Sequence, residues 1–172
     1  MKFSIFLLIL TTVIWGGGFP EFTGKTLAGK SISLPYKNQK QLLILGFDMA
    51  SADPMTQWVK KLNLTPTSNL KWLQVPVIGG VPPFVDGFII GGMKRSVPEQ
   101  WHSNYMPYFG GKKSEILNHI QGSDSLTDKA TPFILLIQKD GNVEFSKQAL
   151  ATTENIQQFI LAIEAFKSDV GD

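Results

Sequence analysis

The residues from Leu42 to Met55 read LLILGFDMASADPM, an apolar strand followed by a tight turn and the start of a helix. Ala52 and Met55 stand three positions apart at that helix start, the spacing of the two cysteines in a Cys-X-X-Cys motif for thiol–disulfide exchange. The nucleophile of that reaction is a thiolate, which neither alanine nor the thioether of methionine can supply. Because the whole sequence contains no cysteine, the chain has no thiol chemistry of its own.

Two carboxylates belong to the same turn. Asp53 could act as a general acid or base, but its expected role is to cap the helix, with Pro54 at the first helical position. Asp48 directly follows the strand, and one carboxylate without a partner is weak support for acid–base catalysis. An enzymatic alternative would therefore need Asp53 and His102 to meet in one cleft.

Other catalytic and metal-binding patterns are missing from the sequence. Its two histidines, His102 and His119, fall on separate predicted helices and lack metal-ligand spacing. No nucleophile elbow, phosphate-binding loop or dinucleotide fingerprint occurs, because the glycines come as pairs at other spacings. We therefore expect neither a metal site nor a cofactor.

Length and composition indicate one globular domain. The chain has 172 residues, of which 43% are hydrophobic and 17% charged. A formal net charge of +2, spread over scattered lysines, argues against a nucleic-acid partner.

The N-terminus has the layout of a secretory signal. Met1-Lys2 precedes the apolar run Phe3–Trp15, and three glycines, Gly16 to Gly18, follow. The run is shorter than the roughly 20 residues that cross a bilayer. Residues 1–18 are thus expected to be a cleaved signal peptide or an uncleaved N-terminal anchor that associates with the membrane. Either reading places the protein in the periplasm or in the secreted fraction.

Periodicity and turn signals predict the remaining elements. Strands are expected at 31–34, 42–47, 70–77, 133–137 and 143–145, and helices at 54–62, 113–120 and from about 152 onward. Asp140-Gly141 predicts a hairpin between the last two strands. One apolar stripe should pack the terminal helix on the sheet: Ile156, Phe159, Ile160, Ile163 and Phe166.

This order of elements predicts an α/β domain over residues 19–172, with a mixed central sheet and helices on both faces. A Gly/Pro-rich segment at about 76–112 is expected to be an inserted, ordered loop or lid. Within it, the Ser96–Glu99 spacing suggests a capping box before a short helix that carries Trp101 and Tyr105.

Two segments resemble the thioredoxin-like superfamily, particularly its secreted and peroxiredoxin-like branches. The first runs from Phe19 to Met55 and leads through a strand ending in Phe47 to the turn that carries paired cysteines in the family. The second, from Thr131 to Gly141, is similar to the family's cis-proline loop, strand and hairpin. The resemblance implies a thioredoxin-like fold and a cis bond before Pro132, a bond that proline tolerates. The missing thiols prevent transfer of the family's redox activity, and of copper carriage by a cysteine pair.

A second resemblance concerns the middle of the chain. Val75-Pro76-Val77 and the stretch Gly91–Arg95 are similar to bacterial relatives of thioredoxin-like mitochondrial ATP synthase assembly factors, which also lack the cysteine pair. This resemblance implies a protein that helps to assemble or hold a membrane complex without catalysis.

Binding of a protein partner is the function that can survive loss of the cysteines. The residue before a cis-proline leaves its backbone free to pair with an added strand. We therefore expect a redox-inactive binding or assembly module, with a peroxiredoxin-like enzyme using non-thiol polar groups as the alternative. The expected binding residues are the degenerate turn (Ala52, Asp53, Pro54, Met55), the loop Thr131-Pro132, and a partner surface of Phe84, Phe88, Trp101 and Tyr105, although the aromatic residues could instead form a lid over the sheet.

Overall fold

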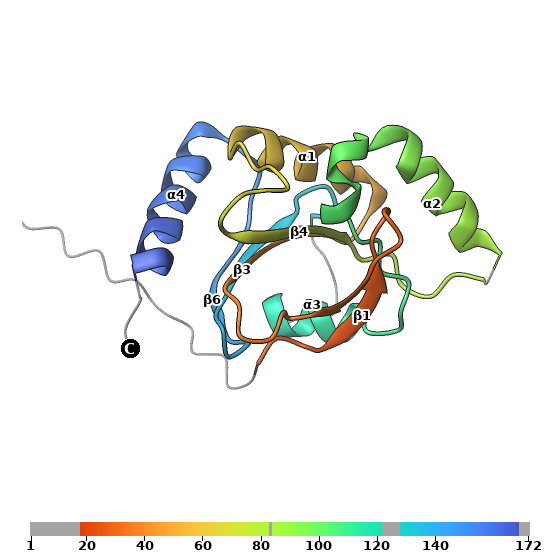
Figure 1. Ribbon diagram of the computed structural model, residues 1–172, viewed down its shortest axis with the longest axis horizontal. Helices are drawn as coiled ribbons and strands as arrows, with labels where there is room; N and C mark the ends of the chain where they lie inside the picture. Colours follow the sequence, from red (N-terminus) through yellow and green to blue (C-terminus); the bar gives the residue numbers. More distant parts are fainter. Residues whose placement is uncertain (1–17, 83, 122–127, 169–172) are drawn as a thin grey trace, which may run out of the picture.

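A mixed sheet of four strands, in the order β4-β3-β5-β6, forms the centre of the molecule. The computed structural model describes residues 18–82, 84–121 and 128–168 (Figure 1), so the expected leader up to residue 17 lies outside the described part. β3 pairs in parallel with β4 and antiparallel with β5, which pairs antiparallel with β6. The strands of this sheet are β3 (Gln41–Gly46), β4 (Lys71–Pro76), β5 (Phe133–Ile137) and β6 (Val143–Gln148).

Helices cover both faces of this sheet (Figure 1). A two-stranded antiparallel ribbon, β1 (Phe22–Lys25) with β2 (Ser31–Leu34), packs on the same face as α3. The opposite face is covered by α1, α4 and the 3-10 helix η2. The helical elements are η1 (Met49–Ser51), α1 (Ala52–Lys61), α2 (Val85–Ser96), η2 (Glu99–Asn104), α3 (Lys113–Gln121) and α4 (Thr153–Ser168).

The alternation of side chains along β3 divides the core in two. Leu43 and Leu45 point to the α3 face, whereas Leu42 and Ile44 point to the face covered by α1 and α4. All of β3 is buried, which explains why its sequence is a continuous apolar run. Trp58 of α1 anchors the second face, with its indole Nε1 donating a hydrogen bond to the carbonyl of Ala149 at 2.8 Å.

The predicted α/β class and mixed sheet are confirmed. Gly141 has a positive φ of 88°, as the tight hairpin between β5 and β6 requires. Asn63 adopts the left-handed conformation just after α1, where the sequence analysis ended that helix.

The middle segment differs from the expected irregular loop. Residues Val85–Ser96 form the helix α2, and the expected short helix follows as η2 from Glu99, but its N-cap is Pro98 and Ser96 is the last residue of α2. Three glycines at 87, 91 and 92 masked the helical pattern, because glycine is a poor helix former. A 3-10 helix, η2, carries Trp101.

Two local predictions were wrong. Asp53 does not cap α1, because the chain first makes the 3-10 turn η1, and Asp48 caps that turn by accepting from the backbone of Ala50. Asp53 and Pro54 lie instead in the first turn of α1. On α4, Phe159 and Phe166 are buried as expected, but Ile160 is 41% exposed, because the stripe is wider than the contact with the sheet.

Candidate functional site

A cavity of about 510 Å³ opens at the carboxyl edge of the parallel strands β3 and β4. Three parts of the chain surround the cavity. These are the ends of β3 and β4, the turn η1 with the start of α1, and the helix α2. The carboxyl ends of adjacent parallel strands are the usual place for ligand sites in α/β sheets. Side chains from all three sides line it: Phe47, Met49, Ala52, Met55, Val77, Ile78, Ile89, Met93, Tyr105 and Lys113.

Gly46 allows the turn to close against the end of β3. A Cβ atom at this position would lie 2.2 Å from the Ser51 Oγ and 2.4 Å from the Met55 Sδ. The Ser51 hydroxyl donates a hydrogen bond to the carbonyl of Asp48 at 2.6 Å, which connects the two ends of the 3-10 turn η1. The absent side chain of Gly46 therefore sets how closely α1 approaches the sheet.

Ala52 and Met55, which were expected to replace a pair of thiols, both line the cavity but differ in exposure. Ala52 is exposed at the start of α1, whereas Met55 is 1% exposed and packs under the turn. Asp53 and Pro54 do not line the cavity. Where a redox protein would present a thiol, this chain presents a methyl group and a thioether.

The cavity wall is largely apolar, and its polar groups are held by the protein itself. The Lys113 ammonium, from α3, donates a hydrogen bond to the carbonyl of Phe47 at 2.7 Å. Burial raises the pKa of the Tyr105 hydroxyl to about 12, so this group remains a neutral phenol at physiological pH. The wall is thus mainly apolar, and its polar residues are Asp48, Ser51, Ser96, Tyr105 and Lys113. Asp48 is the one carboxylate among them, and it accepts a hydrogen bond from the N–H of Ala50 at 3.0 Å.

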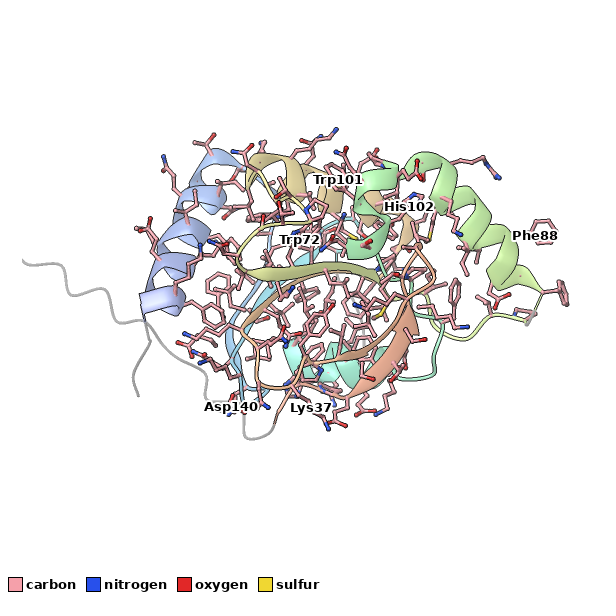
Figure 2. All side chains as sticks on the ribbon, in the orientation of Figure 1. Lys37, Trp72, Phe88, Trp101, His102 and Asp140 are labelled. Atoms are coloured by element: carbon pink, nitrogen blue, oxygen red, sulfur yellow. The ribbon has the colours of Figure 1, made fainter. Side chains whose placement is uncertain are left out.

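The polar pair of the enzymatic alternative does not meet in this cavity. Neither Asp53 nor His102 lines it. His102 lies on η2 near Trp101 (Figure 2), and its Nε2 is 3.0 Å from the carbonyl oxygen of Val97. No group of three or more metal-ligating side chains from His, Cys, Asp and Glu was found among the described residues.

The loop before β5 is not a cis-proline loop. The cis bond among the described residues precedes Pro35, not Pro132, so the expectation for Pro132 is wrong. Thr131 is also not free to pair: its N–H donates to Asp128 Oδ1 at 3.3 Å, and its carbonyl accepts from Gln148 Nε2 at 3.1 Å. These contacts satisfy the backbone groups that strand addition would need, and neither Thr131 nor Pro132 lines the cavity.

The four aromatic residues expected to form a partner surface separate into two sets. Phe84 and Phe88 are 74% and 81% exposed at the outer end of α2. Trp101 and Tyr105 are buried, and Tyr105 contributes to the cavity wall. The expected surface therefore contains only the two phenylalanines, because the tryptophan belongs to the core.

Most of the cavity residues were not predicted from the sequence, among them Met49, Ile89, Met93 and Lys113. Ile89 and Met93 reach the cavity from α2, which the sequence did not predict to be a helix, and Lys113 reaches it from α3. Helical spacing of Ile89 and Met93, four residues apart, was the available signal.

The sheet order and the covering helices match a thioredoxin-like fold, here in a chain without cysteine. Solved structures agree with this class. BsSco, a member of the Sco family of cytochrome c oxidase assembly proteins, matches with a TM-score of 0.58 and 17% identity over 86% of this chain and 92% of its own. Yeast Sco1 matches with a TM-score of 0.53 and 16% identity over 93% of this chain and 99% of its own.

A third match is the exposed lipoprotein thioredoxin Etrx1 of Streptococcus pneumoniae, with a TM-score of 0.50 and 17% identity over 83% of this chain and 99% of its own. At such identities the likenesses establish the fold. No protein-family model and no curated protein matches the sequence. Within the described residues, no helix is both long and apolar enough to span a membrane.

Proposed function

We propose that this protein is a redox-inactive thioredoxin-like binding module that works outside the cytoplasm and holds a partner polypeptide. The observation that carries the proposal is the mainly apolar cavity at the turn into α1, which Ala52 and Met55 line. A concave, mostly apolar site with few polar groups is the usual form of a binding pocket. The occupant is an apolar side chain of the partner.

The partner approaches past Met49. This side chain lines the cavity and is nevertheless 91% exposed, so it stands at the mouth. Methionine adapts its shape to varied apolar partners, and Met55 and Met93 line the same cavity. A partner side chain that enters here would therefore contact flexible thioethers on two sides.

Assembly of a membrane complex is the context we propose for this binding. The support is the apolar leader at the N-terminus, the similarity of the middle segment to ATP synthase assembly factors, and the fold shared with BsSco, itself described as an assembly protein. In that role the module would hold one subunit until it joins its complex, without a chemical step.

Site-specific photocrosslinking in the native envelope tests the proposal. With a photoreactive phenylalanine at Met49, we expect one discrete crosslinked polypeptide that mass spectrometry can identify. The same residue at Leu161, which is 66% exposed on α4, serves as the control and should give none. Equal crosslinking at both positions, or none at Met49, would contradict binding at the cavity.

A further inference from the structure

The outer side of α2 is an apolar surface that the rest of the chain leaves uncovered. No residue of this helix is fully buried. Phe84, which caps the helix, and Phe88 are four positions apart, so their rings lie on the same side, and they are 74% and 81% exposed. Figure 2 shows the Phe88 side chain at the right of the view, pointing away from α2 and from the rest of the molecule.

The same side of the helix continues from the two rings to one cation, Arg95, and a second cation, Lys94, lies about a third of a turn around the helix from it. Arg95 follows Phe88 by seven residues, two helical turns, and so lies on the side of the rings about 10 Å further along the axis. The side chain of Arg95 turns back along the helix, since its Nη1 is 3.8 Å from the position of a Cβ on Gly91. Lys94 is its exposed neighbour. Neither cation forms a salt bridge with any residue in the described ranges.

Glycines leave the helix surface between the rings and the cations without side chains. A Cβ at Gly87 would meet no atom within 4 Å, and one at Gly91 would meet only the Arg95 side chain. The one carboxylate of the helix, Asp86, accepts a hydrogen bond from the N–H of Gly87 at 2.7 Å and belongs to the first turn. The exposed part of α2 therefore has aromatic rings at one end and positive charge at the other.

We propose that α2 docks reversibly on the surface of an anionic lipid bilayer. Phe84 and Phe88 enter the interfacial region, and Lys94 and Arg95 contact the phosphates of the headgroups. A helix with an apolar side and flanking cations lies in the plane of a membrane interface, and each cation near an anionic surface strengthens binding. The proposed docking residues are separate from the cavity, because Phe84, Phe88, Lys94 and Arg95 do not line it.

The absence of native cysteines allows a label that reports on α2 alone. A single cysteine at Gly87, exposed and with open space around it, would carry an environment-sensitive fluorophore in the full-length chain. With vesicles of phosphatidylcholine and phosphatidylglycerol, we expect a blue shift and quenching by brominated lipids. The same label at Leu161 on α4 should show neither change. A local label is needed because the N-terminal segment could hold the whole chain on the vesicle.

Two paired variants separate the aromatic and the charged contributions. Phe84→Ser with Phe88→Ser should weaken partitioning of α2 by roughly tenfold or more on all vesicles, since two exposed rings lose their apolar contact. Lys94→Gln with Arg95→Gln should weaken it by about tenfold on anionic vesicles and leave neutral vesicles nearly unaffected. All four side chains are exposed, so unchanged urea midpoints should accompany both results.

Failure of the label at Gly87 to respond, while co-sedimentation shows the chain on vesicles, would overturn the proposal. So would a response that survives both pairs of substitutions. Neither result bears on the cavity, which the crosslink at Met49 tests independently.

Discussion

Replacing Gly46 with alanine is expected to lower the free energy of unfolding by about 1–3 kcal/mol, because the new methyl group overpacks the turn. Its Cβ would lie 2.2 Å from the Ser51 Oγ and 2.4 Å from the Met55 Sδ, well inside van der Waals contact. Valine should cost more, since its branches extend into the same space. Urea denaturation gives the change directly from the midpoint at constant slope.

A matched control for this prediction is Gly92→Ala on α2. A Cβ there meets nothing within 4 Å, so the substitution should be neutral or stabilising by up to about 1 kcal/mol. In a double-mutant cycle, Met55→Ala should recover part of the cost of Gly46→Ala, because it removes the closest sulfur. If the Gly46→Ala variant unfolds at the wild-type urea midpoint, the prediction is wrong, and the stability of the fold does not depend on the close contact of Gly46 with Ser51 and Met55.

Introducing cysteine at Ala52 should create an unusually reactive thiol in a chain that has none. The position is exposed at the first turn of α1, where the helix dipole favours a thiolate and lowers the thiol pKa. At pH 7 we expect alkylation roughly tenfold faster than that of a cysteine at Leu161, which is also exposed. A Met55→Cys partner, three residues on, should then close a reducible disulfide.

The measurement is the pH dependence of alkylation of the two single variants, followed by disulfide analysis of the Ala52→Cys/Met55→Cys chain. An enhanced rate at residue 52 would indicate that the turn kept the electrostatics of a thiol site and lost only the sulfur atoms. Equal rates at residues 52 and 161 would mean that the turn gives no such activation, and would weaken its interpretation as a degenerate redox site.

Sequence patterns predicted a helix, strand or turn correctly where its own residues determine its structure. The apolar run of β3, the Asp140-Gly141 hairpin and the spacing of Phe159 and Phe166 each specify local structure, and the order of these elements gave the thioredoxin-like class. The helix α2 was missed because its three glycines weaken the periodic signal, and its stability depends on the side chains that line the cavity.

The site was only partly accessible to sequence reasoning. The turn at Ala52 and Met55 was predicted to be a site because a strand, a turn and a helix start follow one another there as in the resembling family, without its two cysteines. The contribution of Lys113 depends on a hydrogen bond to Phe47, which lies 66 residues away in the sequence. The hydrogen bond from the side-chain amide of Gln148 to the carbonyl of Thr131 is likewise a contact between residues far apart in the sequence, so no local spacing predicts it.

The most direct test of binding at the cavity is to fill the cavity from α2 and measure crosslinking from Met49. Gly92 lines the cavity and Gly87 does not, yet a Cβ at either glycine meets open space, so phenylalanine at each is a matched pair. Gly92→Phe should reduce the crosslink to the partner at least about fivefold, whereas Gly87→Phe should leave it within about twofold of wild type. Equal yields from both variants would contradict a partner side chain in the cavity.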